Sequence, residues 1–377
     1  MNGAQLMLEM LASAGVRYVF GNPGSTELPL TDAMVAEDRL EYILGLQEVP
    51  VMGIAEGYAQ ATRQPGVVNL HISPGLGNGL GMLYNAHRAG TPLVVTAGQQ
   101  DRRLRFSEPI LWGEMVEVAR PWTKWSAEVQ RVEDIPAAMR RAIQTALMPP
   151  TGPVFLSIPV DVQQQESPSL DMTPPQPVNP LLRPPADELL RAVDVLATAT
   201  NPAILAGSRV TESDAIAELV GVAEALGAPV ISEPGTTHGR LGFPCTHPLS
   251  APGLPLWAPD IHERLSEFDV ILAVGLDVLR LYVYYEPERA IPEHIRLVHL
   301  DHDPWELRKN HATEVALCGG LKPGLSELEQ QLSDHLTPAQ LESISERRGR
   351  REAMHSEARS SLQAQASAEL PQRPLTS

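Results

Sequence analysis

Three polar side chains that could take part in acid–base or nucleophilic chemistry occur in short loops in the first part of the chain. Ser25 lies in GNPGSTELP, Glu48 in LQEVP and His71 in HISPGLGNG. A carboxylate among apolar residues such as those beside Glu48 can share a proton with a nitrogen base. Histidine can relay protons near neutral pH. These residues are the first candidates for a catalytic site.

Each candidate also has a purely structural interpretation. Ser25 could cap a helix that begins near Glu27, and Glu48 could stabilise the positive end of a helix. A lone histidine such as His71 is more often structural than catalytic. The flanks of Ser25 do not form the G-x-S-x-G turn of serine hydrolases. The loop SPGLGNG resembles a phosphate-binding loop but lacks G-x-G-x-x-G spacing, so a nicotinamide-linked dehydrogenase is a weak alternative.

The elements around these loops predict an α/β fold. Apolar stretches alternate with amphipathic helices, a pattern typical of a parallel sheet that is covered on both faces. The loops holding Ser25, Glu48 and His71, together with AGQQD, each follow an expected strand and should lie along one sheet edge. The expected strands span 18–20, 42–46, 67–71, 92–97 and 154–158.

A second α/β unit is expected after a proline-rich stretch, so the fold class is two doubly wound parallel-sheet domains. Proline removes backbone donors and disfavours helix, which indicates an extended connection. Further strands are expected at 202–206, 229–232, 270–274 and 296–300. The predicted domains are 1–165 and 187–335, with a linker over 166–186 and a helical tail over 336–377.

Composition excludes several classes of protein. The 377 residues carry a formal charge of −17, which disfavours binding to nucleic acids and to anionic membranes. The apolar N-terminus contains Glu9 and no basic segment, so we expect no signal peptide, and no apolar run is long enough to span a membrane. Two distant cysteines form no disulfide or zinc pattern. These features indicate a cytoplasmic protein.

Several motifs in order resemble the thiamine-diphosphate-dependent enzymes, and among them the benzoylformate decarboxylases. The resemblance rests on FGNPGSTELP, YILGLQEVPVMGIAEGYAQ, LHISPGLGNGLG, PLVVTAGQQ, KWS and GPVFLSIPVD, and more loosely on FDVILAVG and LVHLDHDPWEL. It implies that 1–165 is a pyrimidine-binding domain and that the second unit is the family's Rossmann-like central domain.

The resemblance also implies a role for each candidate residue. Glu48 would hydrogen-bond the pyrimidine ring of thiamine diphosphate, Ser25 would bind the carboxylate of a small 2-keto acid, and His71 would relay protons. Pro23 and Asn78 would line the same pocket. The implied activity is that of a carbon–carbon lyase, more precisely a carboxy-lyase.

Two departures from the family pattern limit this inference. The family's decarboxylases carry a second histidine where this chain reads LDVLRLYVYYEPER, and the aligned residue is Tyr282. The GDG and Asn-Asn sequences, which bind Mg²⁺ and the diphosphate in the family, are absent. We therefore expect a diphosphate-binding domain, with the Mg²⁺ ligands, to be supplied in trans or within a homo-oligomer, and this chain to be inactive alone. A carboligase of the acetolactate synthase type and a non-catalytic binding or regulatory module remain alternatives.

Overall fold

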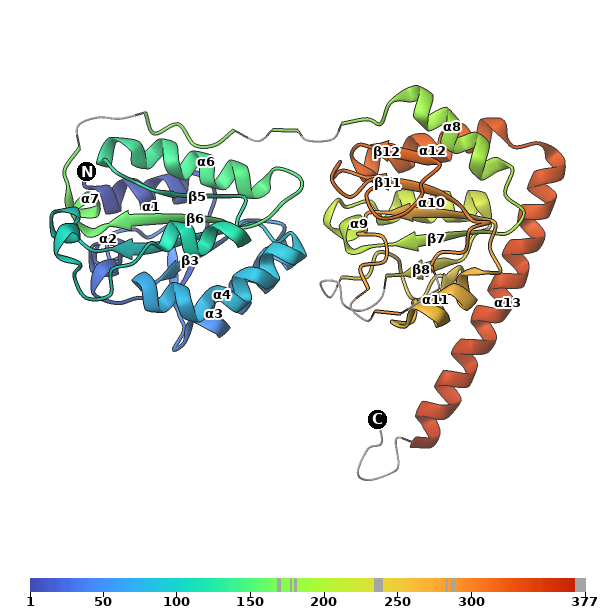
Figure 1. Ribbon diagram of the computed structural model, residues 1–377, viewed down its shortest axis with the longest axis horizontal. Coiled ribbons are helices and arrows are strands. Elements are labelled where there is room, and N and C mark those ends of the chain that lie inside the picture. Colours follow the sequence, from blue (N-terminus) through green and yellow to red (C-terminus); the bar gives the residue numbers. More distant parts are fainter. Residues whose placement is uncertain are drawn as a thin grey trace. The chain divides into compact units, whose positions relative to one another are not determined.

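The computed structural model describes residues 1–167, 171–176, 178–179, 182–233, 240–281, 284–285 and 289–369. The chain forms two compact units, Met1–Asn179 and Pro180–Ser377, which are described separately below (Figure 1). Each unit contains a six-stranded sheet in which every neighbouring pair of strands is parallel. The predicted fold class of two parallel-sheet α/β domains is therefore confirmed.

The sheet of the first unit has the strand order β2-β1-β3-β4-β6-β5. Its strands are β1 (Tyr18–Asn22), β2 (Glu41–Leu44), β3 (Gly66–Leu70), β4 (Leu93–Gln99), β5 (Trp125–Glu128) and β6 (Val154–Pro159). Its α-helices are α1 (Gly3–Ser13), α2 (Leu28–Met34), α3 (Glu48–Thr62), α4 (Ile72–Ala89), α5 (Met115–Ala119), α6 (Ile135–Leu147) and α7 (Val160–Gln164). Connections that alternate strand and helix produce this doubly wound order.

Helices cover both faces of this sheet, as Figure 1 shows. Helices α1 and α6 pack on one face and share a buried cluster with Val67, Val94 and Val154. Helices α3 and α4 pack on the other face and share a second cluster with Phe20 and Phe155. Because β3, β4 and β6 are buried on both faces, these strands are apolar almost throughout, as parallel strands of α/β proteins usually are.

The sheet of the second unit has the order β12-β11-β10-β7-β8-β9. Its strands are β7 (Pro202–Ala206), β8 (Val230–Ser232), β9 (Ser250–Ala251), β10 (Val270–Val274), β11 (Arg296–Asp301) and β12 (Val315–Cys318). Its α-helices are α8 (Ala186–Ala197), α9 (Ser208–Glu212), α10 (Ile216–Leu226), α11 (Ala258–Leu265), α12 (Leu321–His335) and α13 (Pro338–Glu369).

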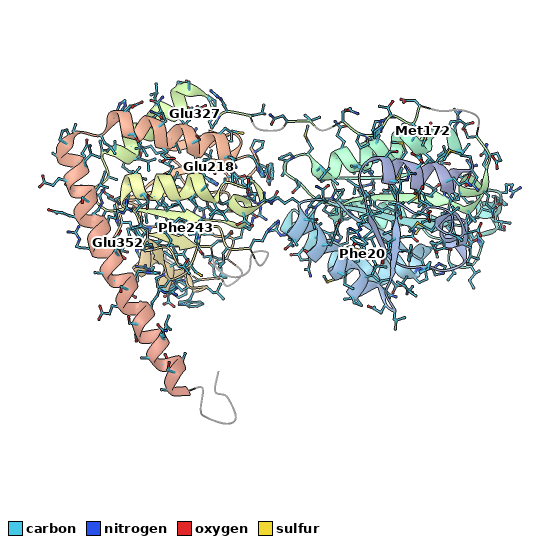
Figure 2. The ribbon with its side chains drawn as sticks, turned by 180° about the vertical axis from the view of Figure 1, so that it is seen from behind. Phe20, Met172, Glu218, Phe243, Glu327 and Glu352 are labelled. Atoms are coloured by element: carbon cyan, nitrogen blue, oxygen red, sulfur yellow. The ribbon has the colours of Figure 1, made fainter. Side chains whose placement is uncertain are left out.

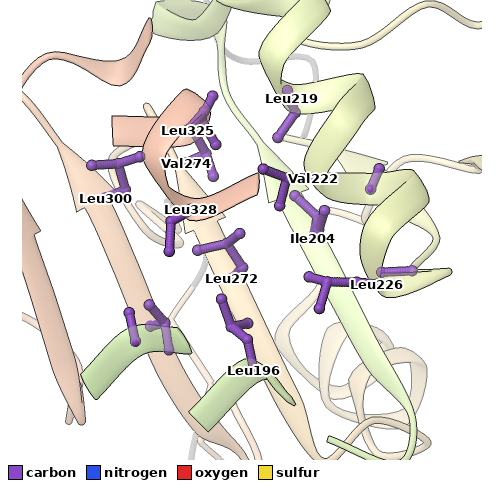
Figure 3. Close-up of a cluster of buried hydrophobic side chains, with 14 of the residues drawn as sticks. Leu196, Ile204, Leu219, Val222, Leu226, Leu272, Val274, Leu300, Leu325 and Leu328 are labelled. Atoms are coloured by element: carbon purple, nitrogen blue, oxygen red, sulfur yellow. The ribbon is translucent and has the colours of Figure 1, made fainter. Parts of the chain in front are cut away.

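A cluster of hydrophobic side chains, most of them aliphatic, joins α8, α10 and α12 to one face of the second sheet. Figure 3 shows Leu272 and Val274 of β10 facing Leu325 and Leu328 of α12. Burying each such side chain contributes about 1.5–3 kcal/mol. Figure 2 labels Phe243, which belongs to this cluster.

The central strands lie where the sequence predicts them, whereas three short strands at or beside the sheet edges were not predicted. These are β5, β9 and β12. The side chains of β5 and β9 are only partly buried, and β12 alternates between buried and more exposed residues. A short edge strand needs no continuous apolar run, so it leaves little signal in the sequence.

The long helix α13 packs at its start against the rest of the second unit and then extends beyond it (Figure 1). Three of its arginines, Arg347, Arg348 and Arg351, contact groups in the rest of that unit. Arg347 donates to the carbonyl oxygen of Leu226 at 2.9 Å, and Arg348 pairs with Glu224 at 2.8 Å. Among the described helices, none is both long enough and apolar enough to cross a membrane.

Candidate active site

The predicted site loops share one edge of the first sheet. Strands β1, β2, β3 and β4 run parallel, so the segments after Asn22, Leu44, Leu70 and Gln99 leave the sheet on the same side. In open α/β sheets, ligands bind beyond this carboxyl edge. The predicted shared edge is confirmed.

Glu48 is the first residue of α3, and its side chain is buried, with only 6% of the residue exposed. Gln47 caps the helix by accepting a hydrogen bond from the amide of Val49 at 2.7 Å. Two asparagine amides approach the Glu48 carboxylate. Nδ2 of Asn22 donates to Oε1 and Nδ2 of Asn78 donates to Oε2, each at 3.0 Å. The carboxylate is thus fixed from the end of β1 and from α4.

The apolar surroundings that the sequence suggested for Glu48 were wrong in part. Leu44 is 62% exposed and Leu46 is 91% exposed, whereas Val51 and Met52 are buried. The two leucines lie at and just after the end of edge strand β2, whose residues are exposed or half-buried. The immediate partners of the carboxylate are amides, which provide hydrogen bonds rather than an apolar wall.

Glu48 and His71 both lie beside Gly75 of α4. A Cβ atom on Gly75 of α4 would lie 3.5 Å from Oε1 of Glu48 and 3.4 Å from Cβ of His71. Both side chains therefore reach van der Waals distance of the same point. The structure thus brings the Glu48 carboxylate and the Cβ atom of His71, which are separated in sequence by a helix and a strand, to the same glycine.

His71 precedes α4 and bonds to a second buried carboxylate. Its Nδ1 lies 2.8 Å from Oε2 of Glu27, whose side chain is 1% exposed. The imidazole also lies directly against the backbone of Gly24, because a Cβ at that position would overlap Nδ1, Cγ and Cε1 of the ring. A glycine is required at this close approach.

Glu27 connects the loop after β1 with the start of α4 and with strand β4. Its Oε1 accepts from the backbone amides of Gly98 at 2.8 Å and Ile72 at 3.3 Å, and from the hydroxyl of Thr26 at 2.8 Å. Its Oε2 accepts from the amide of Gly24 at 2.9 Å. The sequence indicates Glu27 only as an acidic residue at a helix start. The available signal was the spacing G-S-T-E, which matches that of a capping box.

Ile72 adopts a backbone conformation that β-branched residues rarely have. Its φ is +35°, and the residue is fully buried. Such strain costs of order 1–3 kcal/mol and persists only when neighbouring contacts impose it. Here the amide of Ile72 bonds to Glu27, and the carbonyl oxygen of His71 accepts from the amide of Gly75 at 2.7 Å.

A buried polar row lies beside Glu27 in the sheet. The hydroxyl of Tyr42 donates to Oδ1 of Asn69 at 3.2 Å, and Nδ2 of Asn69 donates to Oγ1 of Thr96 at 3.2 Å. Burial, followed by the nearby negative charge of Glu27, raises the pKa of Tyr42 well above its usual value. The Tyr42 phenol therefore stays neutral and acts here as a hydrogen-bond donor.

The remaining predicted residues are Ser25, Pro23 and Tyr282. Ser25 is exposed and begins the short 3-10 helix Ser25–Glu27, whose N-cap is Gly24, so the helix-capping interpretation of Ser25 was wrong. Pro23 is half-buried in the same loop. Tyr282 lies outside the described residues.

Comparisons with known proteins agree with this geometry. The N-terminal TPP binding domain of thiamine pyrophosphate enzymes matches residues 1–110, and the central domain of the same enzymes matches residues 189–328. The chain belongs to the thiamine pyrophosphate enzyme family. Its two units are therefore the pyrimidine-binding and central domains of that family.

Individual members of the family are also similar. Benzoylformate decarboxylase from Pseudomonas aeruginosa is 36% identical over 332 residues, covering 88% of this chain and 62% of that protein. A probable acetolactate synthase large subunit from Methanocaldococcus jannaschii is 29% identical, covering 87% of this chain and 56% of that protein.

Among solved structures, the thiamine diphosphate-dependent 4-hydroxybenzoylformate decarboxylase of Rhodococcus jostii RHA1 superimposes with a TM-score of 0.81 at 35% identity. The match covers 88% of this chain and 62% of that one. The chain thus spans about three fifths of the length of these relatives.

Proposed function

We propose that this chain forms the pyrimidine-binding half of the active site of a thiamine diphosphate-dependent 2-keto acid decarboxylase of the benzoylformate decarboxylase type. The observation that carries the proposal is the buried Glu48 carboxylate, held by Asn22 and Asn78 beside His71. The family match and the similarity to two decarboxylases support it.

The residues at this edge suit a nitrogen heterocycle. An ionised carboxylate has about four acceptor positions, and the two asparagine amides occupy two of those on Glu48. Each oxygen therefore keeps capacity for a further partner, such as a protonated ring nitrogen. Asn22 and Asn78 would hold the carboxylate in place while it binds the pyrimidine.

The described residues do not form a binding site for Mg²⁺ and the diphosphate. They contain no cluster of three or more His, Cys, Asp or Glu side chains that could hold a metal ion. The sequence 1–377 also lacks GDG and Asn-Asn. We propose that Mg²⁺ and the diphosphate are bound by residues outside this segment, contributed in trans by another chain or within an oligomer. The isolated segment would then be inactive.

Each candidate residue of this chain then has its own role in decarboxylation. Bound thiamine diphosphate supplies an electron sink for the pair released as carbon dioxide leaves. Glu48 holds the proton shared with the pyrimidine ring. Ser25, exposed in its loop, binds the carboxylate of the substrate, and His71 exchanges a proton with the substrate oxygen.

Calorimetry tests this proposal. Thiamine diphosphate and Mg²⁺ would be titrated into the full chain alone, and into the chain mixed with a diphosphate-binding domain from a related decarboxylase. We expect saturable binding only in the mixture, followed by release of carbon dioxide from benzoylformate. Absence of binding in a mixture that has demonstrably assembled would contradict the proposal and favour a non-catalytic module.

A carboligase is the second candidate, because several similar proteins are acetolactate synthases. The same assembled mixture separates the two activities. Supplied with pyruvate, a carboligase would form acetolactate from two molecules of pyruvate with loss of one carbon dioxide. The decarboxylase proposed here would release an aldehyde and one carbon dioxide for each molecule of 2-keto acid.

A further inference from the structure

The hydrogen-bond donors around Glu27 indicate which group carries the hydrogen between Glu27 and His71. The backbone amides of Gly24, Ile72 and Gly98 all point at its two oxygens, at 2.9, 3.3 and 2.8 Å. A backbone amide can only donate, so both oxygens of the buried carboxyl group act as acceptors. The hydroxyl of Thr26, 2.8 Å from Oε1, supplies another donor.

The contact between Glu27 and His71 then requires a hydrogen on the imidazole. Nδ1 of His71 lies 2.8 Å from Oε2 of Glu27, and two lone pairs facing each other at that distance would repel. An ionised carboxylate has no hydrogen to give, so opposite it the hydrogen lies on Nδ1. The second ring nitrogen, Nε2, points away from Glu27 and keeps its lone pair when the ring is neutral.

The backbone around the ring opposes reorientation. The imidazole lies against Gly24, with no room for even a Cβ atom between them. The strained backbone of Ile72 follows His71 directly and is held by the same carboxylate. Glu27 therefore controls both the ring and the backbone that carries it.

We propose that Glu27 is a positioning residue that fixes His71 as the Nδ1–H tautomer, so that Nε2 is the nitrogen that exchanges protons with the substrate. The second clause rests on the proposed function, whereas the tautomer does not. Glu27 acts through His71 and makes no contact with the reacting atoms in this role.

Nitrogen NMR of the full chain, labelled with ¹⁵N in its histidine rings, tests the tautomer without cofactor or partner. The signals of His71 are identified by their loss in a His71→Asn variant. At a pH where the ring is neutral, we expect the wild-type Nδ1 to carry the hydrogen and Nε2 to be bare. A wild-type His71 with its hydrogen on Nε2 overturns the proposal, and this measurement needs no folded variant of Glu27.

Two substitutions make the test specific. Glu27→Gln replaces the charged acceptor by an amide that can donate to Nδ1, so the Nε2–H form should gain roughly tenfold relative to Nδ1–H. Thr26→Val removes only one neutral donor from Oε1, and the tautomer should not change. If folded Glu27→Gln retains the wild-type tautomer, Glu27 does not set it.

The outcomes separate this inference from the proposed function. An Nδ1–H tautomer that depends on Glu27, in an assembled mixture that binds no thiamine diphosphate, would leave the positioning role intact and remove the decarboxylase proposal. The reverse result, decarboxylation with an Nε2–H tautomer, would remove the positioning role alone.

Discussion

The backbone of Gly24 lies against the imidazole of His71 so closely that a Cβ on residue 24 would overlap three atoms of the ring. His71 cannot move aside freely, because its Nδ1 is bonded to the buried carboxylate of Glu27 at 2.8 Å. The size of the residue at position 24 therefore decides whether the imidazole can occupy its place.

Replacing Gly24 by alanine should destabilise the first unit. Overpacking of a close contact typically costs about 1–3 kcal/mol. Urea unfolding of the full chain, with peptides of the first unit followed by hydrogen exchange, measures this change. Gly77→Ala is the matched control. A Cβ there meets nothing within 4 Å, so alanine should be neutral or stabilising by up to about 1 kcal/mol in helix α4. Equal effects of the two substitutions would contradict the packing argument.

Glu48→Gln should reduce turnover of the assembled decarboxylase. Glutamine keeps the shape of the side chain but loses the charge that would hold a proton on the pyrimidine ring, and acid–base groups contribute about 10²–10⁴-fold. The measurement is kcat with benzoylformate in the reconstituted mixture. Glu41→Gln, an exposed carboxylate on neighbouring strand β2, should leave kcat unchanged. Turnover by Glu48→Gln at the wild-type rate would refute the role of Glu48.

Arg209→Met should strongly destabilise the second unit. Arg209 donates to Asp301 and to Asp277, each at 2.8 Å, and Asp301 is fully buried. Removing the arginine leaves a buried carboxylate without its partner, which typically costs about 3–5 kcal/mol. Hydrogen exchange of β10 and β11 at increasing urea concentration reports the loss.

The control for this substitution is a similar ion pair at the surface. Arg296 bonds to both oxygens of Glu314 at 2.8 Å, but both side chains are about two-fifths exposed. Arg296→Met should therefore cost no more than about 1 kcal/mol. Equal losses for the two arginines would show that burial does not govern these pairs.

The stability of the second unit should decrease as the pH falls below 6.5, the ordinary pKa of histidine. Burial lowers the pKa of His299, which is 1% exposed, and burial also lowers the pKa of His311. In acid, the two histidines therefore bind protons in the unfolded chain that they do not bind in the folded unit. The stabilising contribution of the two histidines is complete above pH 6.5. As the pH falls from there toward the lowered pKa of each folded histidine, the free energy of unfolding decreases by up to about 1.4 kcal/mol per pH unit for each histidine.

Asparagine substitutions isolate this contribution from that of the carboxylates. His299→Asn and His311→Asn should each reduce the slope of the unfolding free energy between about pH 5 and about pH 6.5. The double variant should remove both contributions. An unchanged slope in the double variant would show that other groups govern the acid sensitivity of this unit.

The sequence alone determined the fold class and the positions of the central strands. Apolar or nearly apolar runs such as Val154–Pro159 and Val270–Val274 are typical of strands inside a covered sheet, so the local pattern and the final structure agree. It also indicated that the loops of Ser25, Glu48 and His71 share one edge, because parallel strands leave no other arrangement.

Only the tertiary structure decided which groups touch. The partners of Glu48 are Asn22 and Asn78, 26 and 30 residues away in the sequence, and no local pattern links them. The same is true of Glu27, which receives the amide of Gly98 from 71 residues away. A hydrogen bond forms over about 3 Å, whereas sequence periodicity places a side chain only on a face of the sheet. The site that the sequence outlined as three loops therefore became two buried carboxylates and one oriented imidazole only when the strands were packed side by side.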